Sequence, residues 1–365
     1  MNGPDNLLPS PIEAANVPEV RNHTRYPSQY FQMIDTADTL FHVIVTRITY
    51  DLTQLNNQGY PAETKEQTPL CEADEHYGAP NESSVIQESD YAPFKPKCDV
   101  LIVNASAHAP PTPSANGERK AMQRFPAGVR ITFDNATSNH WQKLLTVTGP
   151  RTLKAGLLGG FTLSEPEPVT SVPIRYEHAY GGTNQWWKGW PQPADDDQRM
   201  EIDVHDVYNP IGCGVVNPAW QQKTQAHHKN HYPAPQIEAF NEPFTANHAE
   251  AAAAKSGAAH PDEAPPVYPA IGLGPIGRWW LPRRKKAGSY DEIWKATRWP
   301  KLPQDFDFGY WNAAPEDQQL DYPSGGEHVT LINLHETHSE LRFRLPKAEL
   351  HVRARLEMGD RKSVV

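Results

Sequence analysis

Alternating apolar and polar residues predict short strands in the first half of the chain. Residues 41–50 (FHVIVTRITY) are rich in β-branched and aromatic side chains, which favour strands. Apolar residues alternate with Arg and Thr at 129–133, and the pattern returns at 144–148. A period of two implies one buried and one solvated face. We therefore expect residues 41–180 to form an antiparallel β region, preceded by an N-terminal arm at 1–40.

Residues 181–320 show a different pattern, in which Gly, Pro and Trp gather in segments such as GGTNQWWKGWP. Proline and glycine interrupt helices and strands, so an irregular region is expected. One short helix is predicted at 289–297, with Ser289 as its cap. Residues 245–266 are rich in alanine but have no apolar face, which predicts a mobile loop containing at most one helical turn.

The period of two returns near the end of the chain, at 329–334, 341–345 and 350–356. Residues 321–365 are therefore expected to supply strands that pack back on the β region. The predicted fold class is mainly β, with antiparallel, sandwich-like sheets, long Gly/Pro/Trp-rich loops and few short helices.

Composition and charge exclude several classes of protein. The net charge is −10 and no long basic stripe occurs, which argues against nucleic-acid binding. No apolar run approaches the roughly 20 residues of a membrane span. The start of the chain lacks a basic segment followed by an apolar core, so we expect a cytoplasmic protein. Three widely spaced cysteines indicate no disulfide framework.

Candidate chemistry is sparse, and no catalytic residue, metal or cofactor is predicted. His227, His228 and His231 lack a carboxylate or thiolate at ligand spacing. The glycines at 272, 274 and 277 match a dinucleotide-binding pattern, but the prolines around them favour a packed turn. Cys213 lies between two glycines, and as a nucleophile it would need a nearby base or a helix N-terminus.

The tryptophans and one basic run are candidates for binding. Clustered Trp residues are either core fillers, a protein-binding surface or a sugar-stacking platform, and Trp and Arg are common at interface hot spots. The basic run either faces solvent or contacts an acidic partner. The predicted interface residues are Trp186, Trp187, Trp190, Arg283, Arg284, Lys285 and Lys286.

An ordered series of motifs gives a further clue. It comprises RYEHAYGG at 175–182, NPIGCG at 209–214, RWP at 298–300, NAAPEDQQ at 312–319 and GGE at 325–327. The series resembles family 2169 of domains of unknown function over roughly residues 35–350. We expect a structural role for its members Arg175, Tyr176, Glu177, Gly181, Gly182, Asn209, Pro210, Gly212, Gly214, Arg298, Trp299, Pro300, Asn312, Pro315, Gln318, Gln319, Gly325, Gly326 and Glu327.

The resemblance implies a non-enzymatic role in bacterial type VI secretion. Proteins of this family are similar to adaptors or chaperones that stabilise a toxin effector and help to load it onto the secretion spike. The implied spike partners are a valine-glycine-repeat protein (VgrG) and its proline-alanine-alanine-arginine-repeat (PAAR) tip. Two alternatives from other classes stay open, a hydrolase-like enzyme or a carbohydrate-binding module using the Gly- and Trp-rich region.

Overall fold

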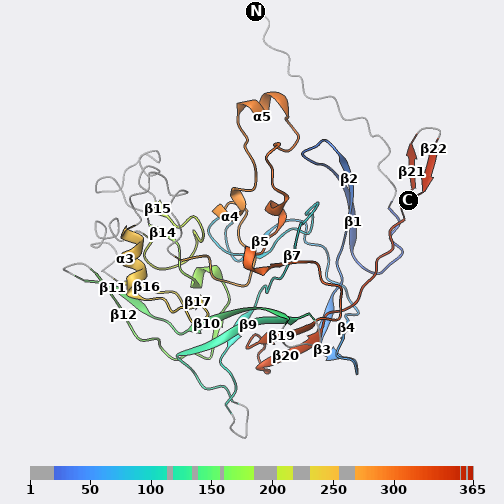
Figure 1. The fold of residues 1–365 in the computed structure, drawn as a ribbon. Coiled ribbons are helices and arrows are strands. Elements are labelled where there is room, and N and C mark those ends of the chain that lie inside the picture. The colour runs from blue at the N-terminus through green and yellow to red at the C-terminus, as the bar shows by residue number, and fades with distance from the viewer. Residues whose placement is uncertain are drawn as a thin grey trace, which may run out of the picture.

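The computed structural model describes residues 20–112, 118–133, 139–156, 160–184, 204–216, 231–254, 268–353, 355–358 and 361–364. Strands in antiparallel sheets dominate this part of the chain, and its three α-helices are short, which confirms the predicted mainly β fold class. The strands form one five-stranded sheet, one three-stranded sheet and seven two-stranded ribbons, rather than two sheets of similar size. Figure 1 shows the arrangement.

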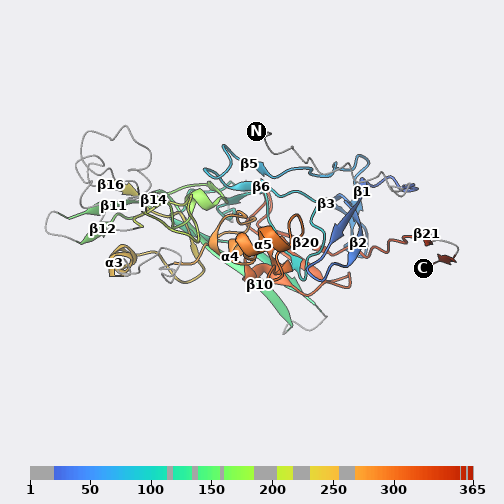
Figure 2. The same ribbon diagram turned by 90° about the horizontal axis from the view of Figure 1, so that it is seen from above.

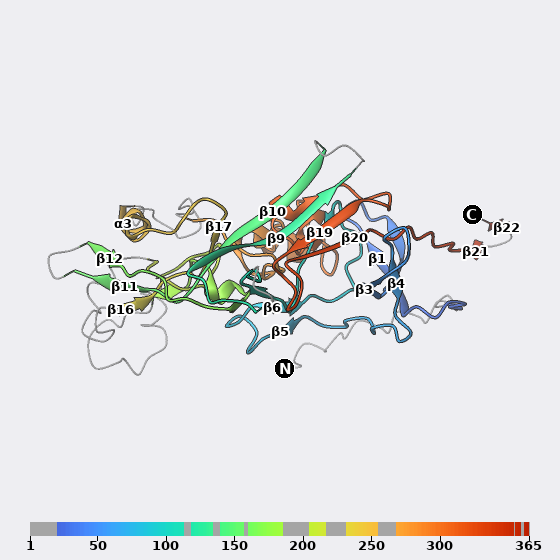
Figure 3. The same ribbon diagram turned by 90° about the horizontal axis from the view of Figure 1, so that it is seen from below.

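The five-stranded sheet unites three distant parts of the chain. Its order is β17 (Ile237–Ala239), β10 (His140–Thr148), β9 (Arg124–Thr132), β19 (His328–Ile332) and β20 (Glu340–Arg344). Every neighbouring pair is antiparallel. The period of two at 129–133 and 144–148 is confirmed by these pairings, and so is the return of a strand from the C-terminal region. Figure 3 shows this sheet from below.

Most of the remaining strands are only two to four residues long. The three-stranded sheet has the order β12 (Phe161–Leu163), β11 (Thr152–Ala155) and β16 (His231–Pro233). The ribbons pair β1 (Ser28–Ile34) with β2 (Leu40–Thr46), β3 (Tyr50–Leu55) with β4 (Pro61–Glu63), β5 (Glu75–His76) with β6 (Val85–Gln87), β7 (Cys98–Asp99) with β18 (Gln319–Leu320), β8 (Ser106–His108) with β13 (Ser171–Pro173), β14 (Thr183–Asn184) with β15 (Val204–His205), and β21 (Arg355–Met358) with β22 (Arg361–Val364).

Two of the expected regions differ from the structure at their ends. The segment expected to be an arm contains β1, which pairs with β2 over seven residue pairs. Its sequence SQYFQMI includes aromatic and apolar side chains of the kind that favour strands. The last hairpin, β21–β22, pairs with itself in the described chain and does not join the five-stranded sheet. It lies apart from the body in Figures 1 and 2.

The helices include one that the sequence did not predict. The α-helices are α3 (Ala246–Ala254), α4 (Leu281–Arg284) and α5 (Glu292–Thr297), and the 3-10 turns are η1 (Tyr176–His178), η3 (Phe308–Trp311) and η4 (Glu316–Gln318). Within 245–266, the expected loop is instead helical for nine residues. Alanine has the highest helix propensity, and Ala249 is fully buried in the main core beside Phe244. Residues 255–266 lie outside the described chain.

A buried ion pair fastens the five-stranded sheet to the three-stranded sheet. Arg151 precedes β11 and Glu238 lies in β17, and their side chains meet at 2.5 Å with neither exposed to solvent. The same Glu238 oxygen accepts a 2.8 Å hydrogen bond from the backbone N–H of Phe244, at the start of the α3 segment. Removing one partner of such a pair leaves an uncompensated buried charge. The pair therefore fixes the position of α3 as well as that of both sheets.

None of the helices in the described residues is long and apolar enough to cross a membrane.

Candidate protein-interaction surface

The most exposed aromatic group in the described chain surrounds α5. The helix begins after Asp291, whose carboxylate accepts a 2.8 Å hydrogen bond from the N–H of Trp294, so Asp291 rather than Ser289 is the cap. Ser289 instead donates to Asp305 at 2.7 Å. Figure 1 shows α5 at the tip of a protrusion, on the opposite side of the molecule from the five-stranded sheet.

Large apolar side chains cover this protrusion. Ile293 is 72% exposed, Trp299 69% and Tyr290 54%. The ring of Trp294 contacts both aromatic neighbours edge-on, with centroids 4.7 Å from Tyr290 and 5.5 Å from Trp299. We call these four residues the α5 crest. The Trp294 ring lies nearly perpendicular to both neighbours, at 73° to Tyr290 and 88° to Trp299.

Polar contacts hold the crest against the β1–β2 turn. Arg298 donates to the carbonyl of Thr36 at 3.1 Å and to the carboxylate of Asp38 at 3.3 Å. Lys301 lies 3.1 Å from the other oxygen of Asp38. The hydrogen bond from Lys301 is the main reason that the pKa of Asp38 is lowered, so this carboxylate is charged at neutral pH. The motif Arg-Trp-Pro thus both exposes a tryptophan and anchors the segment that carries it.

The β1–β2 ribbon continues the exposed apolar area. In the register of this ribbon, Ile34 lies opposite Leu40 and Tyr30 opposite Ile44, so all four side chains share one face. Ile34, Leu40 and Ile44 are exposed, and so is Phe41 near the turn. An apolar area of this kind marks an interaction site more often than scattered single residues do.

The predicted interface residues have different outcomes. Trp186, Trp187 and Trp190 lie outside the described residues. The prediction for Arg283 is wrong, because this side chain is 3% exposed. Its guanidinium pairs with Glu88 at 2.6 Å.

Arg283 also joins two backbone segments by hydrogen bonds. It donates to the backbone carbonyls of Tyr310 and Ile276. The other three cations of the basic run are more accessible. Arg284 and Lys285 are exposed, and Lys286 lies 3.3 Å from Glu316.

The glycines of the two central motifs allow close backbone contact. A Cβ on Gly181 would lie 2.1 Å from the carbonyl oxygen of Asn209, and one on Gly182 would lie 2.6 Å from that of Gly212. Both glycines have positive φ angles, which L-amino acids rarely adopt. The buried amide of Asn209 donates to the carbonyls of Tyr176 and Tyr180, each at 3.0 Å. These contacts support the expected structural role.

The flanking motif residues act in the same way. Glu177 accepts a 2.7 Å hydrogen bond from the N–H of Ser84, and the Arg175 guanidinium lies 3.5 Å from the ring centroid of Tyr77. Pro210 directly follows Asn209 and is buried. Gly214 has a positive φ angle and no room for a side chain, since a Cβ would lie 3.1 Å from the Tyr180 ring.

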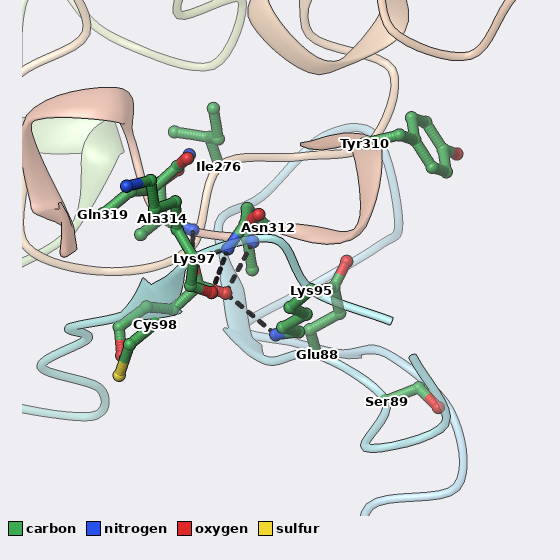
Figure 4. Close-up of polar contacts among 12 residues, drawn as sticks. Glu88, Ser89, Lys95, Lys97, Cys98, Ile276, Tyr310, Asn312, Ala314 and Gln319 are labelled. Atoms are coloured by element: carbon green, nitrogen blue, oxygen red, sulfur yellow. Dashed lines mark hydrogen bonds and ion pairs between the residues drawn. The ribbon is translucent and has the colours of Figure 1, made fainter. Parts of the chain in front are cut away.

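The later motifs build a hydrogen-bonded hub on Asp99. Its carboxylate accepts from the side chain of Asn312 at 2.9 Å, from the N–H of Ala313 at 2.9 Å and from Lys95 at 2.8 Å, and Figure 4 shows Asn312 and Lys95 within this group of contacts. Gln318 is fully buried and donates to the carbonyls of Val100 and Leu273. The remaining motif residues lie at turns and caps: Pro315 is the N-cap residue of η4, Gln319 donates to Ala314, Pro300 follows Trp299, Gly325 and Gly326 have positive φ, and Glu327 accepts from Ser324.

The features that suggested enzymatic chemistry have structural surroundings. Burial raises the pKa of the Cys213 thiol to about 12, so it is not a thiolate at neutral pH. A Cβ on Gly272 would lie 2.6 Å from the ring of Tyr176, and one on Gly277 2.7 Å from Trp280, which fits the predicted packed turn. His231 is exposed, whereas His227 and His228 lie outside the described residues. No group of three or more potential metal ligands occurs in the described chain.

Sequence reasoning missed the crest as a surface. Trp294 and Trp299 were considered among the clustered tryptophans but were not chosen as interface residues, and Ile293 was not singled out. The available signal was a six-residue helix with a cap, too short to bury its Ile and Trp side chains by itself.

Comparison with known proteins gives a family but no characterised relative. The chain matches the family model described as "Uncharacterized protein conserved in bacteria (DUF2169)" over residues 38–365. No curated protein and no solved structure matches it. Because the match covers most of the chain, from β2 to β22, the protein belongs to this bacterial family, DUF2169.

Proposed function

We propose that the protein is a type VI secretion accessory protein, an adaptor or chaperone that binds a toxin effector and helps to load it onto the VgrG or PAAR spike component. The observation that carries this proposal is the α5 crest. Ile293 and Trp299 are mostly exposed on a segment that Arg298 and Asp291 hold in place. Aromatic anchors on a preorganised segment are typical of interface hot spots, because little side-chain entropy is lost on binding.

The charges around the crest suit recognition more than catalysis. Arg298 and Lys301 share the single carboxylate of Asp38, so these three groups leave one net positive charge beside the apolar side chains. Burial of apolar area then supplies most of the affinity, whereas rim charges mainly affect the association rate. The cytoplasm is the compartment in which such an adaptor would meet its toxin before secretion.

Co-expression tests this function. Candidate toxin and spike proteins, chosen from the products of neighbouring genes, are expressed with and without this protein, and soluble toxin is quantified. We expect more soluble toxin in its presence, because a partner that binds only the folded state stabilises it by mass action. Equal toxin yields, together with no toxin or spike protein on the immobilised adaptor, would remove the proposal.

A further inference from the structure

A second candidate binding site lies near β3 and β4, away from the crest. It is an open cleft of about 600 Å3 lined by Tyr50, Gln58, Tyr60, Pro61, Glu63, Pro346 and Lys347. The walls come from two segments that are far apart in the sequence, the β3–β4 ribbon and the chain just after β20. A hydrogen bond of 2.8 Å from the N–H of Arg344 to the carbonyl of Gly59 joins them.

The Gly-Gly-Glu motif shapes this cleft. Gly325 and Gly326 have φ angles of 85° and 95°. A Cβ on Gly325 would lie 2.8 Å from the Lys347 side chain, and one on Gly326 would lie 3.4 Å from the hydroxyl of Tyr60. Because glycine has no side chain, Lys347 and Tyr60 can both lie close to this turn. The Arg344 guanidinium stands over the Tyr60 ring, with 5.1 Å to its centroid, which fixes the ring orientation.

Within the described chain, most polar groups of the cleft are unpaired and can donate a hydrogen bond, although the tyrosine hydroxyls and the Gln58 amide can also accept one. Among the described residues, no hydrogen-bond partner is found for the hydroxyls of Tyr50 and Tyr60, the Gln58 amide or the Lys347 ammonium group. The carboxylate Glu63 is already engaged, because one of its oxygens accepts from Tyr26 at 2.8 Å and pairs with Arg25. A ligand that suits this lining offers acceptors to the free donors and flat apolar rings to the tyrosines and prolines.

We propose that this cleft binds an extended, proline-containing peptide segment of a partner. Proline has no N–H, and the polyproline II conformation leaves its carbonyl oxygens free to accept hydrogen bonds. Aromatic-lined grooves recognise such segments by stacking against their rings. A sugar is the competing occupant, because the second oxygen of Glu63 can accept from its hydroxyl groups, and titration with a cello-oligosaccharide distinguishes the two. The inference does not depend on the identity of the toxin or the spike protein.

The test is a binding titration with fluorescein-labelled decaproline, followed by anisotropy, on the full chain. We expect saturable binding to the wild-type protein. Tyr50→Phe and Tyr60→Phe keep the rings but remove one donor each, and each should weaken binding by about fivefold. Tyr322→Phe, at an exposed tyrosine that belongs to neither the cleft lining nor the crest, is the matched control and should bind as the wild type does. Unchanged thermal unfolding shows that each variant is folded.

Three outcomes would overturn the proposal. The first is a lack of saturable binding up to about 1 mM peptide, which leaves no useful affinity. The second is equal binding by the wild-type protein and the Tyr50→Phe/Tyr60→Phe double variant. The third is binding of a cello-oligosaccharide that depends on both hydroxyls while decaproline fails to bind. Because neither toxin nor spike is present, the assay stands apart from the co-expression test of function.

Discussion

The guanidinium of Arg298 donates a 3.1 Å hydrogen bond to the carbonyl oxygen of Thr36, although the two residues are separated by 262 positions in the chain. This contact joins the α5 crest to the turn between β1 and β2. The two elements are small, and a six-residue helix or a two-stranded ribbon is marginally stable alone. Their mutual support explains how apolar side chains can stay exposed on both elements in a fixed arrangement.

Replacing Arg298 should loosen this arrangement. Arg298→Ala loses hydrogen bonds to the carbonyls of Thr36 and Leu302 and the ion pair with Asp38. We expect a loss of about 1–3 kcal/mol in the free energy of unfolding, measured by chemical denaturation, and faster proteolysis within 289–303. Lys285→Ala is the control, and a change within about 0.5 kcal/mol is expected for such an exposed residue. Equal stability of both variants would contradict the anchoring role.

Gly181 should tolerate no side chain. The Cβ of a Gly181→Val variant would lie 2.1 Å from the Asn209 carbonyl oxygen at a positive φ angle, so we expect a cost of about 3–5 kcal/mol and insoluble protein. Gly274→Ala is the matched control, since its Cβ meets no atom closer than 3.7 Å. The soluble fraction on expression is the measurement. A soluble Gly181→Val protein with one lost activity would instead mark a functional site.

Stability should fall as the pH rises through the range in which Asp206 titrates. Burial raises the pKa of this carboxyl to about 6, from about 3.9 in the unfolded chain. The folded state therefore binds the proton more tightly, and the resulting stability is complete below pH 4 and lost as the pH passes 6. Asp206→Asn should remove this dependence and gain at most about 2 kcal/mol at pH 7.5, because Asp206 keeps some solvent contact.

The comparison of wild type and variant across pH is the decisive part of that experiment. Denaturation curves at pH 5 and pH 7.5 give the difference in unfolding free energy for each protein. A variant whose advantage over the wild type is the same at both pH values would show that Asp206 is not the titrating group.

Cys213 should resist alkylation in the native protein. With a pKa of about 12, its thiol forms almost no thiolate at pH 7.5, and the thiolate is the reactive form. Mass spectrometry after iodoacetamide treatment should show slow labelling at Cys213, and full labelling after denaturation. Rapid, stoichiometric modification of native Cys213 would revive the enzyme alternative.

Sequence reasoning was most successful where the pattern is local. The alternation at 129–133 and 144–148 predicted paired strands, which follows from the side-chain period. The glycines at 181 and 182 were expected to have a structural role, and their positive φ angles agree with it. Contacts between distant residues were not predictable. Arg283 belongs to a basic run that resembles a solvated surface, and only the folded chain brings Glu88 beside it.

The same limit explains the errors in helices and surfaces. The alanine-rich segment has no apolar face by spacing, yet Ala249 is small enough to enter the core next to Phe244. The exposed crest depends on the position of Thr36, which no period in the sequence reveals.

The central claim is tested most directly by capture of the toxin and spike protein on immobilised adaptor variants. Ile293→Asp places a charge at the most exposed apolar position of the crest, and Val352→Asp makes the same change at an exposed valine on another segment. Burying an unpaired charge at an interface is costly, so we expect Ile293→Asp to reduce capture at least about tenfold, with unchanged unfolding, while Val352→Asp captures as the wild type does. Equal capture by all three proteins, or no capture by the wild type, would contradict the account.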